Sequence, residues 1–207
     1  MFGDPISRCP KWPLERFGEL LAEPLRNGLS PAKDGQHFAK VFTLSAITGD
    51  GFDETAWKDA AFARQPEKER QASGNLFLIC RGNGNRRLVG SGRFPVRLAE
   101  SMVFPDTMIA AVSQRDRLSP AFLESAWQQT SARSQIEAGA RTTNGTFKIN
   151  QTVIEDIRLP VPPLPLQNEF TLRVTDIRDL ETQQASSRRR LDDLFASLLH
   201  RAFNGQL

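Results

Sequence analysis

The chain has few of the residues from which disulfide-stabilised, zinc-bound or membrane-spanning proteins are built. Its 207 residues include two cysteines, Cys9 and Cys80, and neither belongs to a C-x-x-C pair. Two separated cysteines are too few for a disulfide framework or a structural zinc site. The longest apolar runs, such as 76–80 and 108–112, are about five residues long, whereas a membrane-spanning helix needs about 20. No basic segment followed by an apolar one is visible at the N-terminus, so we expect a cytoplasmic protein.

Motifs that carry catalysis are also missing from the sequence. Gly82-x-Gly84 is followed at position 87 by arginine, so the dinucleotide-binding fingerprint fails, and there is no G-x-x-x-x-G-K-[ST] phosphate loop. No acidic residue is followed two positions later by lysine, as in many nucleases. No acidic or amide residue precedes a Pro-Pro-aromatic run, as in adenine methyltransferases. His37 and His200 are far apart and have no metal-ligating neighbour at helical spacing. These absences favour a non-catalytic binding module with no cofactor and no metal of its own.

Positive charge, in contrast, is concentrated in two windows. The formal net charge is +3 and the sequence pI is about 9.2. Residues 71–99 contain five arginines and no acid, and residues 138–154 contain Arg141 and Lys148 and no acid. Acidic residues gather elsewhere, around positions 50–59 and along the C-terminal segment. Segregation of this kind produces a face suited to phosphate groups.

The first window includes a loop of arginine, asparagine and glycine directly after the apolar run 76–80, which we predict to be a buried strand. Arginine pairs bidentately with guanine and asparagine with adenine, while glycine allows a close approach of the backbone. A hydrophilic hairpin turn would have the same composition, so composition alone leaves both interpretations open. Arg81, nearest the strand, is the best candidate for contact with a base edge. The candidate DNA-binding residues are Arg81, Asn83, Asn85, Arg86, Arg87, Arg141, Asn144 and Lys148.

The C-terminal segment predicts a long helix after a proline-rich approach. Prolines at positions 160, 162 and 163 force extended backbone, and Pro165 fits the first helical turn. Residues 167–203 contain neither proline nor glycine, and at 1.5 Å per residue they would form a rod of roughly 55 Å. The apolar stripe of this helix is interrupted by a polar middle from 181 to 190. An ordinary amphipathic helix and a spacer helix that also mediates assembly both remain possible, and the length and the divided stripe favour the second. The candidate interface residues are Ile177, Leu180, Leu191, Leu194, Phe195, Leu198 and Leu199.

The remaining pattern predicts an α+β body over 1–163 of mixed short strands and helices, followed by the long coiled-coil-type helix over 164–207. Leu14, Phe17, Leu20 and Leu21 have helical spacing, so we expect a short helix over 14–22. Residues 59–73 are charged and weakly helical, and 107–113 predict a strand. Ser119-Pro120 is a helix start that would carry Trp127, and Asn144-Gly145 is a tight turn before a strand.

Five segments resemble the DNA specificity subunits of type I restriction–modification systems. Phe2-Gly3-Asp4-Pro5 with Trp12 is similar to the opening of the family's repeat, and Asn27 to Pro31 to its Gly-x-Ser-Pro loop. Residues 76–85 resemble a strand followed by a Ser-Arg-x-Asn loop, with Cys80 in place of the serine, and 88–90 follow as expected. Most specific is the ending, an Ile/Leu-Pro-x-Pro-Pro-Leu-x-x-Gln pattern over 159–167 followed by LDDLFASLLHRAFNGQL over 191–207.

The resemblance implies a target recognition domain that binds one half of a bipartite DNA site, and a long helix that sets spacing and docks partners. Those partners would be modification subunits, which bind S-adenosylmethionine and methylate adenine N6, and a restriction subunit with motor and nuclease activity. The specificity subunit itself does no chemistry.

The chain departs from the family in number, because family members usually contain two recognition domains and two long helices. The resemblance therefore implies a half-size subunit. It would form a head-to-tail homodimer that recognises an interrupted palindrome, or it would pair with another half-subunit. The remaining alternatives are a non-catalytic protein-interaction adaptor, the defunct half of an interrupted specificity subunit, and a standalone nuclease or methyltransferase.

Overall fold

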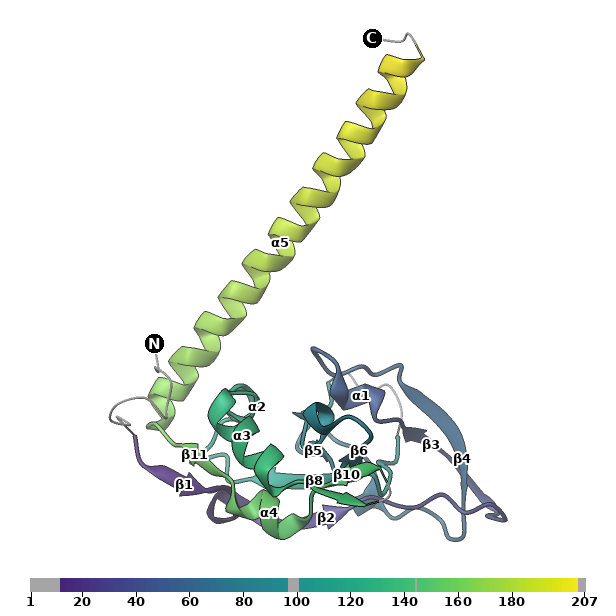
Figure 1. Ribbon diagram of the computed structural model, residues 1–207, viewed down its shortest axis with the longest axis vertical. Coiled ribbons are helices and arrows are strands. Elements are labelled where there is room, and N and C mark those ends of the chain that lie inside the picture. The colour runs from purple at the N-terminus through teal and green to yellow at the C-terminus, as the bar shows by residue number, and fades with distance from the viewer. Residues whose placement is uncertain (1–11, 97–100, 144, 205–207) are drawn as a thin grey trace. The chain divides into compact units, whose positions relative to one another are not determined.

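The computed structural model describes residues 12–96, 101–143 and 145–204 and confirms the α+β class (Figure 1). By contacts it divides into two units, Met1–Leu164, called the body below, and Pro165–Leu207. Several residues named above lie outside the described ranges. These are Phe2-Gly3-Asp4-Pro5, Cys9, Asn144, Gly205 and Leu207.

A four-stranded antiparallel sheet organises the body. Its strand order is β2 (Leu21–Asn27), β8 (Met108–Ser113), β5 (Phe77–Cys80) and β7 (Gly92–Arg93). All four residues of β5 are buried, which explains why its sequence is continuously apolar rather than alternating. On one face, Leu78 and Cys80 join a cluster with Phe42, Ile47 and Phe104. The predicted strands over 76–80 and 107–113 are therefore confirmed.

The opposite face of this sheet is covered by a tryptophan from a helix. The Ser119-Pro120 start is confirmed, because α2 (Pro120–Trp127) has Ser119 as N-cap and proline in its first turn. Trp127 is fully buried, packs edge-on against Phe77 at a centroid distance of 5.5 Å and donates from Nε1 to the Gly90 carbonyl at 2.7 Å. A second helix, α3 (Thr130–Gly139), begins after a break at Gln128–Gln129.

The prediction of a helix over 14–22 is wrong. The chain forms strand β1 (Leu14–Arg16), a single 3-10 helix over Phe17–Leu20, and then enters β2. The 3-10 helix buries Phe17 and Leu20, while β1 pairs with β11 (Arg158–Pro160) and Leu21 pairs with Ser113 of β8. Strand pairing at both ends thus outweighs a helical spacing that extends over only two turns.

The prediction of a weak helix over 59–73 is also wrong. Residues up to Phe62 belong to β4 (Trp57–Phe62), which pairs along its full length with β3 (His37–Phe42). The two strands form an antiparallel ribbon, and α1 (Ser45–Thr48) lies between them in sequence. Phe62 is 2% exposed and packs with Val41 and Val103, so burial on one face of the ribbon fixes the strand. Only Lys68–Arg70 form a helical turn.

A smaller three-stranded sheet has the order β6 (Gly82–Asn83), β10 (Thr146–Lys148) and β9 (Arg141–Thr143). The chain turns between β9 and β10 through Gly145, whose φ of +74° favours glycine. The helix α4 (Gln151–Asp156) follows, capped by the Asn150 side chain, which accepts from the Val153 amide. Sequence reasoning missed α4, although asparagine is a preferred N-cap.

The C-terminal unit is one helix, α5 (Leu164–Phe203), of 40 residues. It begins three residues before the expected Gln167 and includes Pro165 in its first turn, as expected. At 1.5 Å per residue the rod is about 60 Å long. No helix in the described part of the chain has a stretch long and apolar enough to cross a membrane.

Candidate nucleic-acid interface

The small sheet brings the two acid-free windows together. Strand β6 comes from the first window, and β9 and β10 come from the second. Antiparallel pairing places Gly82 opposite Lys148 and Asn83 opposite Phe147, while Lys148 also lies opposite Arg141. A Cβ at position 82 would lie 3.2 Å from Lys148 Cγ, so glycine lets the lysine stem cross the strand closely. Arg81, directly before β6, therefore lies beside a sheet that carries Arg141 and Lys148, 60 or more positions later in the sequence.

Arg81 is fixed by its backbone on both sides. Its amide donates to the Thr107 carbonyl at 2.8 Å, and its carbonyl accepts from the Ile149 amide at 2.9 Å. Its guanidinium also donates to the Asp106 carbonyl at 3.3 Å. This half-buried arginine retains further donors, because a guanidinium has five N–H groups.

Asn83 and Asn85 shape the loop rather than projecting from it. The Asn83 Oδ1 accepts from the Asn85 amide at 2.9 Å, and the Asn85 Oδ1 accepts from the Arg87 amide at 3.0 Å. Asn85 thereby caps a 3-10 helix over Arg86–Leu88. Each oxygen already accepts one hydrogen bond within the turn, which restricts the bidentate pairing of these side chains with an adenine.

Arg86 is also bound to the protein. Its Nη2 and Nε both donate to the Glu137 carbonyl of α3, at 2.6 and 3.2 Å. From the same helix, Arg133 Nη2 donates to the carbonyls of Arg87 and Val89 at 2.9 and 2.8 Å. Burial lowers the pKa of Arg133, and the nearby Glu137 opposes that shift. Two arginines therefore clamp the loop onto α3 from opposite directions.

Three basic side chains remain directed toward solvent. Arg87, Arg141 and Lys148 are exposed, and their side chains make no hydrogen bond or ion pair with the described residues. Arg87 lies on the clamped loop, and the other two lie opposite each other on the β9–β10 hairpin. Three exposed cations on rigid elements are suited to successive phosphates, with Arg81 beside them as the candidate for a base edge.

Sequence reasoning missed the residues that support this surface. Ser30 donates to the Asp106 carboxylate at 2.6 Å, and the Asp106 backbone in turn accepts from Arg81. Gly28 packs tightly here, because a Cβ at this position would lie 2.0 Å from the Pro105 carbonyl oxygen. In the sequence, residues 27–31 stood out only by their resemblance to a family loop, which gave no indication of the segment that they pack against.

Arginines in the first window do not all belong to this surface. Arg93 is 7% exposed and donates to the carbonyls of Gly92, Gly49 and Asp50 at 2.8–3.2 Å. Its Nε lies 3.8 Å from a Glu124 carboxylate oxygen. Arg93 therefore links segments inside the body, and the number of arginines in the first window overstates the cationic surface.

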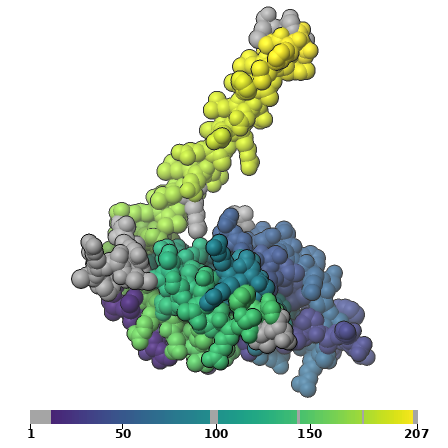
Figure 2. All heavy atoms as spheres, viewed as in Figure 1, coloured from purple at the N-terminus to yellow at the C-terminus, as the bar shows by residue number. Residues whose placement is uncertain are grey.

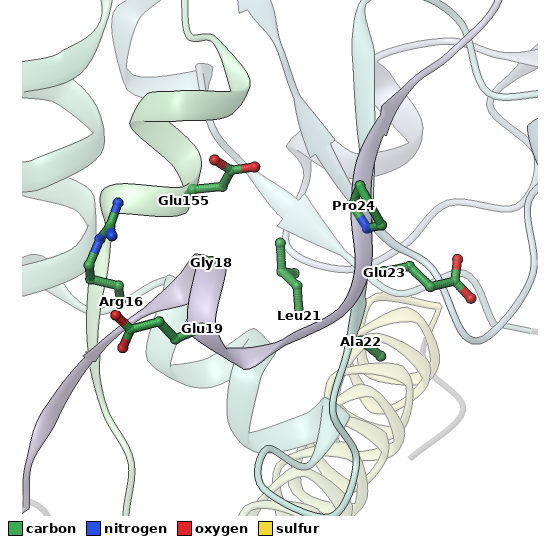
Figure 3. A pocket seen from close by; sticks show the side chains of 8 residues that line it. All are labelled: Arg16, Gly18, Glu19, Leu21, Ala22, Glu23, Pro24 and Glu155. Carbon is green, nitrogen blue, oxygen red and sulfur yellow. The ribbon is translucent and has the colours of Figure 1, made fainter.

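A hollow elsewhere in the body is lined by acidic residues, in contrast to the cationic surface (Figure 3). It has a volume of about 500 Å³ and is lined by Glu19, Glu23 and Glu155, with Arg16 at one side. Figure 3 shows these carboxylates coming from different segments around Leu21. Arg16 forms an ion pair with Asp156 and also interacts with Glu19 and Glu155, but one cation cannot balance three glutamates. The hollow is unsuited to a phosphate backbone.

The described residues form no metal-binding cluster, and the cysteine among them is buried. Those residues contain no cluster of three or more His, Cys, Asp or Glu side chains that could hold a metal ion. Burial raises the pKa of the Cys80 thiol to about 11. That thiol lies 3.6 Å from the Gly82 carbonyl oxygen and packs in the core as a small apolar group.

The seven candidate interface residues on α5 are all exposed. Ile177, Leu180, Leu191, Leu194 and Phe195 are between 54% and 65% exposed, and Leu198 and Leu199 are 42% exposed. Leu172 and Phe203 of the same helix are exposed too, at 67% and 88%.

No protein-family model matches the chain.

Curated relatives and solved structures do match it. The chain is 29% identical over 202 residues to the type I restriction enzyme EcoKI specificity subunit of Escherichia coli (strain K12), covering 92% of this chain and 42% of that protein. It is 32% identical over 85 residues to the type I restriction enzyme EcoDI specificity subunit of Escherichia coli, covering 39% of this chain and 19% of that one.

The fold is shared with the HsdS subunit from Thermoanaerobacter tengcongensis, at a TM-score of 0.60 and 20% identity, with 100% of this chain and 48% of that one covered. A chain from a structural study of complex assembly and conformational transition of the type I R-M system gives a TM-score of 0.64 at 20% identity. That match covers 100% of this chain and 49% of the other. The chain thus spans less than half the length of these proteins.

Proposed function

We propose that this chain, a homologue of the specificity subunits of type I restriction enzymes, is a sequence-specific DNA-recognition subunit of such a system. The observation that carries the proposal is the β6-β10-β9 sheet, which joins two acid-free windows into one cationic surface. In this proposal Arg87, Arg141 and Lys148 bind phosphates and Arg81 contacts a base edge. Phosphate contacts fix the position of the protein on the duplex, and base contacts supply specificity.

The chain does no chemistry itself in this proposal. Modification subunits would bind S-adenosylmethionine and methylate adenine N6 at the site that the chain recognises, and a restriction subunit would join for cleavage. The names of the relatives, which call each a specificity subunit of a type I restriction enzyme, support this division of labour.

A second part of the proposal is that two copies pair head to tail through α5. The exposed stripe is apolar at both ends and polar between 181 and 190. Residues 164–184 contain four acids and two arginines, whereas 185–203 contain four arginines and two aspartates. Antiparallel pairing places the acidic half of one helix against the basic half of the other, while parallel pairing opposes like charges. A homodimer would recognise an interrupted palindrome.

Salt dependence of DNA binding tests the recognition proposal. Neutralising phosphates releases counterions, so log K should fall linearly with log salt, with a slope of about −0.9 per phosphate contact. For the contacts proposed here we expect a slope of about −3 or steeper, measured by fluorescence anisotropy. Binding that is absent at low salt, or independent of salt, would contradict the proposal and favour a protein-interaction adaptor. A mass equal to one chain in gel filtration, with or without modification subunit, would exclude the dimer.

A further inference from the structure

Among the described residues of the body, the β3–β4 ribbon carries the most exposed large apolar side chain. Phe38 is 78% exposed, compared with 52% for Val96 and 41% for Leu14. Figure 2 shows the ribbon, in blue, at the surface of the body. A solitary exposed aromatic residue is common on proteins and carries little meaning alone, so the surroundings of Phe38 decide what it indicates.

The two faces of the ribbon differ in character. On one face, Val41 and Phe62 are buried against Val103. Register pairs Phe38 with Ala61 and Lys40 with Asp59 on the other face, where the Lys40 ammonium lies 4.2 Å from the centre of the Trp57 ring. Phe42 and Trp57 on this face pack against the core of the body, so the face is exposed at the end that carries Phe38, with the Lys40 cation beside it.

The ribbon also has a basic surround. Residues 32–42 and 57–65 contain Lys33, Lys40, Lys58 and Arg64, against only Asp34 and Asp59. Such a cationic patch with an exposed aromatic ring is complementary to a polyanion that presents apolar groups within a groove. It would repel a basic partner, and Phe38 is the one large apolar side chain exposed on the described residues of the ribbon.

A short segment links the ribbon to the candidate interface. Val103 donates to the Lys40 carbonyl at 2.9 Å, and Arg81 donates to the Thr107 carbonyl at 2.8 Å. Hydrogen-bonded neighbours such as Lys40 and Val103, or Thr107 and Arg81, lie about 5 Å apart. The segment from 103 to 107 spans at most about 14 Å, and Phe38 lies about 7 Å along the strand from Lys40. Phe38 and Arg81 are therefore separated by no more than about 30 Å, which is less than one turn of duplex at roughly 34 Å.

We propose that the β3–β4 ribbon enters the major groove of the bound duplex and that Phe38 contacts a thymine methyl group there. The major groove admits a two-stranded ribbon, and the thymine C5-methyl is the apolar group that it presents. This inference rests on the proposed DNA recognition and assigns a second reading element to it, distinct from the β6-β10-β9 sheet.

The test uses the full chain and duplexes that the wild-type chain enriches from a random-sequence pool, synthesised with thymine or with uracil. Phe38→Ala should weaken binding to the thymine duplex by about 5- to 30-fold, as expected when one partly buried apolar side chain is lost from the interface. The log–log salt slope should not change, because phenylalanine carries no charge. Uracil lacks the methyl group, so wild type should lose about 3- to 5-fold on the uracil duplex, whereas Phe38→Ala should lose nothing further.

Two control variants separate this inference from its alternatives. Leu14→Ala truncates an exposed leucine on β1, at the opposite end of the body from the ribbon in Figure 1, and should bind both duplexes as wild type does. Phe38→Leu keeps an apolar group and should retain part of the thymine preference. Melting temperatures should be equal throughout, because both side chains are exposed.

Equal DNA binding by wild type and Phe38→Ala would overturn the ribbon inference and leave the proposed function standing. So would a Phe38→Ala variant that binds DNA normally but no longer captures the modification subunit, since the ribbon would then be a protein-docking surface. Absence of salt-dependent DNA binding by wild type would instead contradict the proposed function and, with it, this inference.

Discussion

The body and the C-terminal helix use apolar side chains in opposite ways. In the body the large apolar residues are mostly buried, and the described exceptions are Leu14, Phe38 and Val96. On α5, nine large apolar residues are more than 40% exposed. An apolar side chain left in water forgoes about 1.5–3 kcal/mol of burial free energy. The comparison indicates that the body is stabilised by its own core, whereas α5 exposes the apolar side chains that the proposed pairing of two copies would bury.

The largest effect should come from emptying the body's core. Trp127→Ala removes a fully buried ring, its contacts with Phe17 and Phe77 and its hydrogen bond to Gly90. We expect a loss of about 3–5 kcal/mol in the free energy of unfolding, measured by urea denaturation. An unchanged midpoint would mean that the body is not stabilised by this core and that the comparison with α5 is wrong.

Alkaline pH should reveal the buried thiol of the same core. Burial raises the pKa of Cys80 from 9.0 to about 11 in the folded chain. The unfolded chain therefore ionises first, so stability is full below about pH 9 and falls as the pH rises toward the folded pKa. The difference between the folded and unfolded pKa values corresponds to a loss of about 2–3 kcal/mol in the free energy of unfolding. Cys80→Ala should remove this part of the pH dependence, and an identical profile in both proteins would contradict it.

Substitution on the helix should separate assembly from folding. Leu194→Ala should weaken self-association by roughly 10- to 100-fold, as expected for about 1.5–3 kcal/mol of lost burial, in analytical ultracentrifugation. The melting temperature of the body should stay the same. Leu172→Ala, a similarly exposed leucine of α5 that is not among the candidate interface residues, is the matched control and should leave association unchanged. Equal effects of both variants would show that the stripe is not the interface.

The smallest effects should distinguish adjacent arginines in the clamped loop. Arg86→Ala loses two hydrogen bonds to Glu137 and should lower stability by about 1 kcal/mol. Arg87→Ala loses no side-chain contact with the described residues and should leave stability unchanged. It should weaken binding to all duplexes alike and reduce the salt slope by about 1. The reverse pattern would exchange the roles of the two residues.

The sequence predicted the features that depend on local chemistry or on continuous patterns. The buried strand 76–80, the Ser119-Pro120 helix start and the long helix are examples, and the structure confirms each. Prediction from the sequence failed where pairing with strands far along the chain determines the local structure. Residues 14–22 have helical spacing, but β11 and β8 draw the chain into strands.

The candidate surface was predicted in the same partial way. Arginine-rich windows indicated where charge gathers, yet only the β6–β10 pairing shows that the two windows meet. Which arginines support the protein and which face solvent depends on contacts with α3, far along the chain. Arg86 and Arg87 are adjacent and chemically identical, so no local pattern could have separated them.

Base-resolution mapping of N6-methyladenine tests the central claim most directly. The chain would be co-expressed with the type I modification subunit from the same genome, in a host whose own adenine methylation is removed. The account predicts methylation at an interrupted palindrome, because two identical recognition domains would face opposite halves of the site. Methylation at an asymmetric bipartite site would contradict the homodimer, and a soluble complex that methylates no site would contradict the proposed role in DNA recognition.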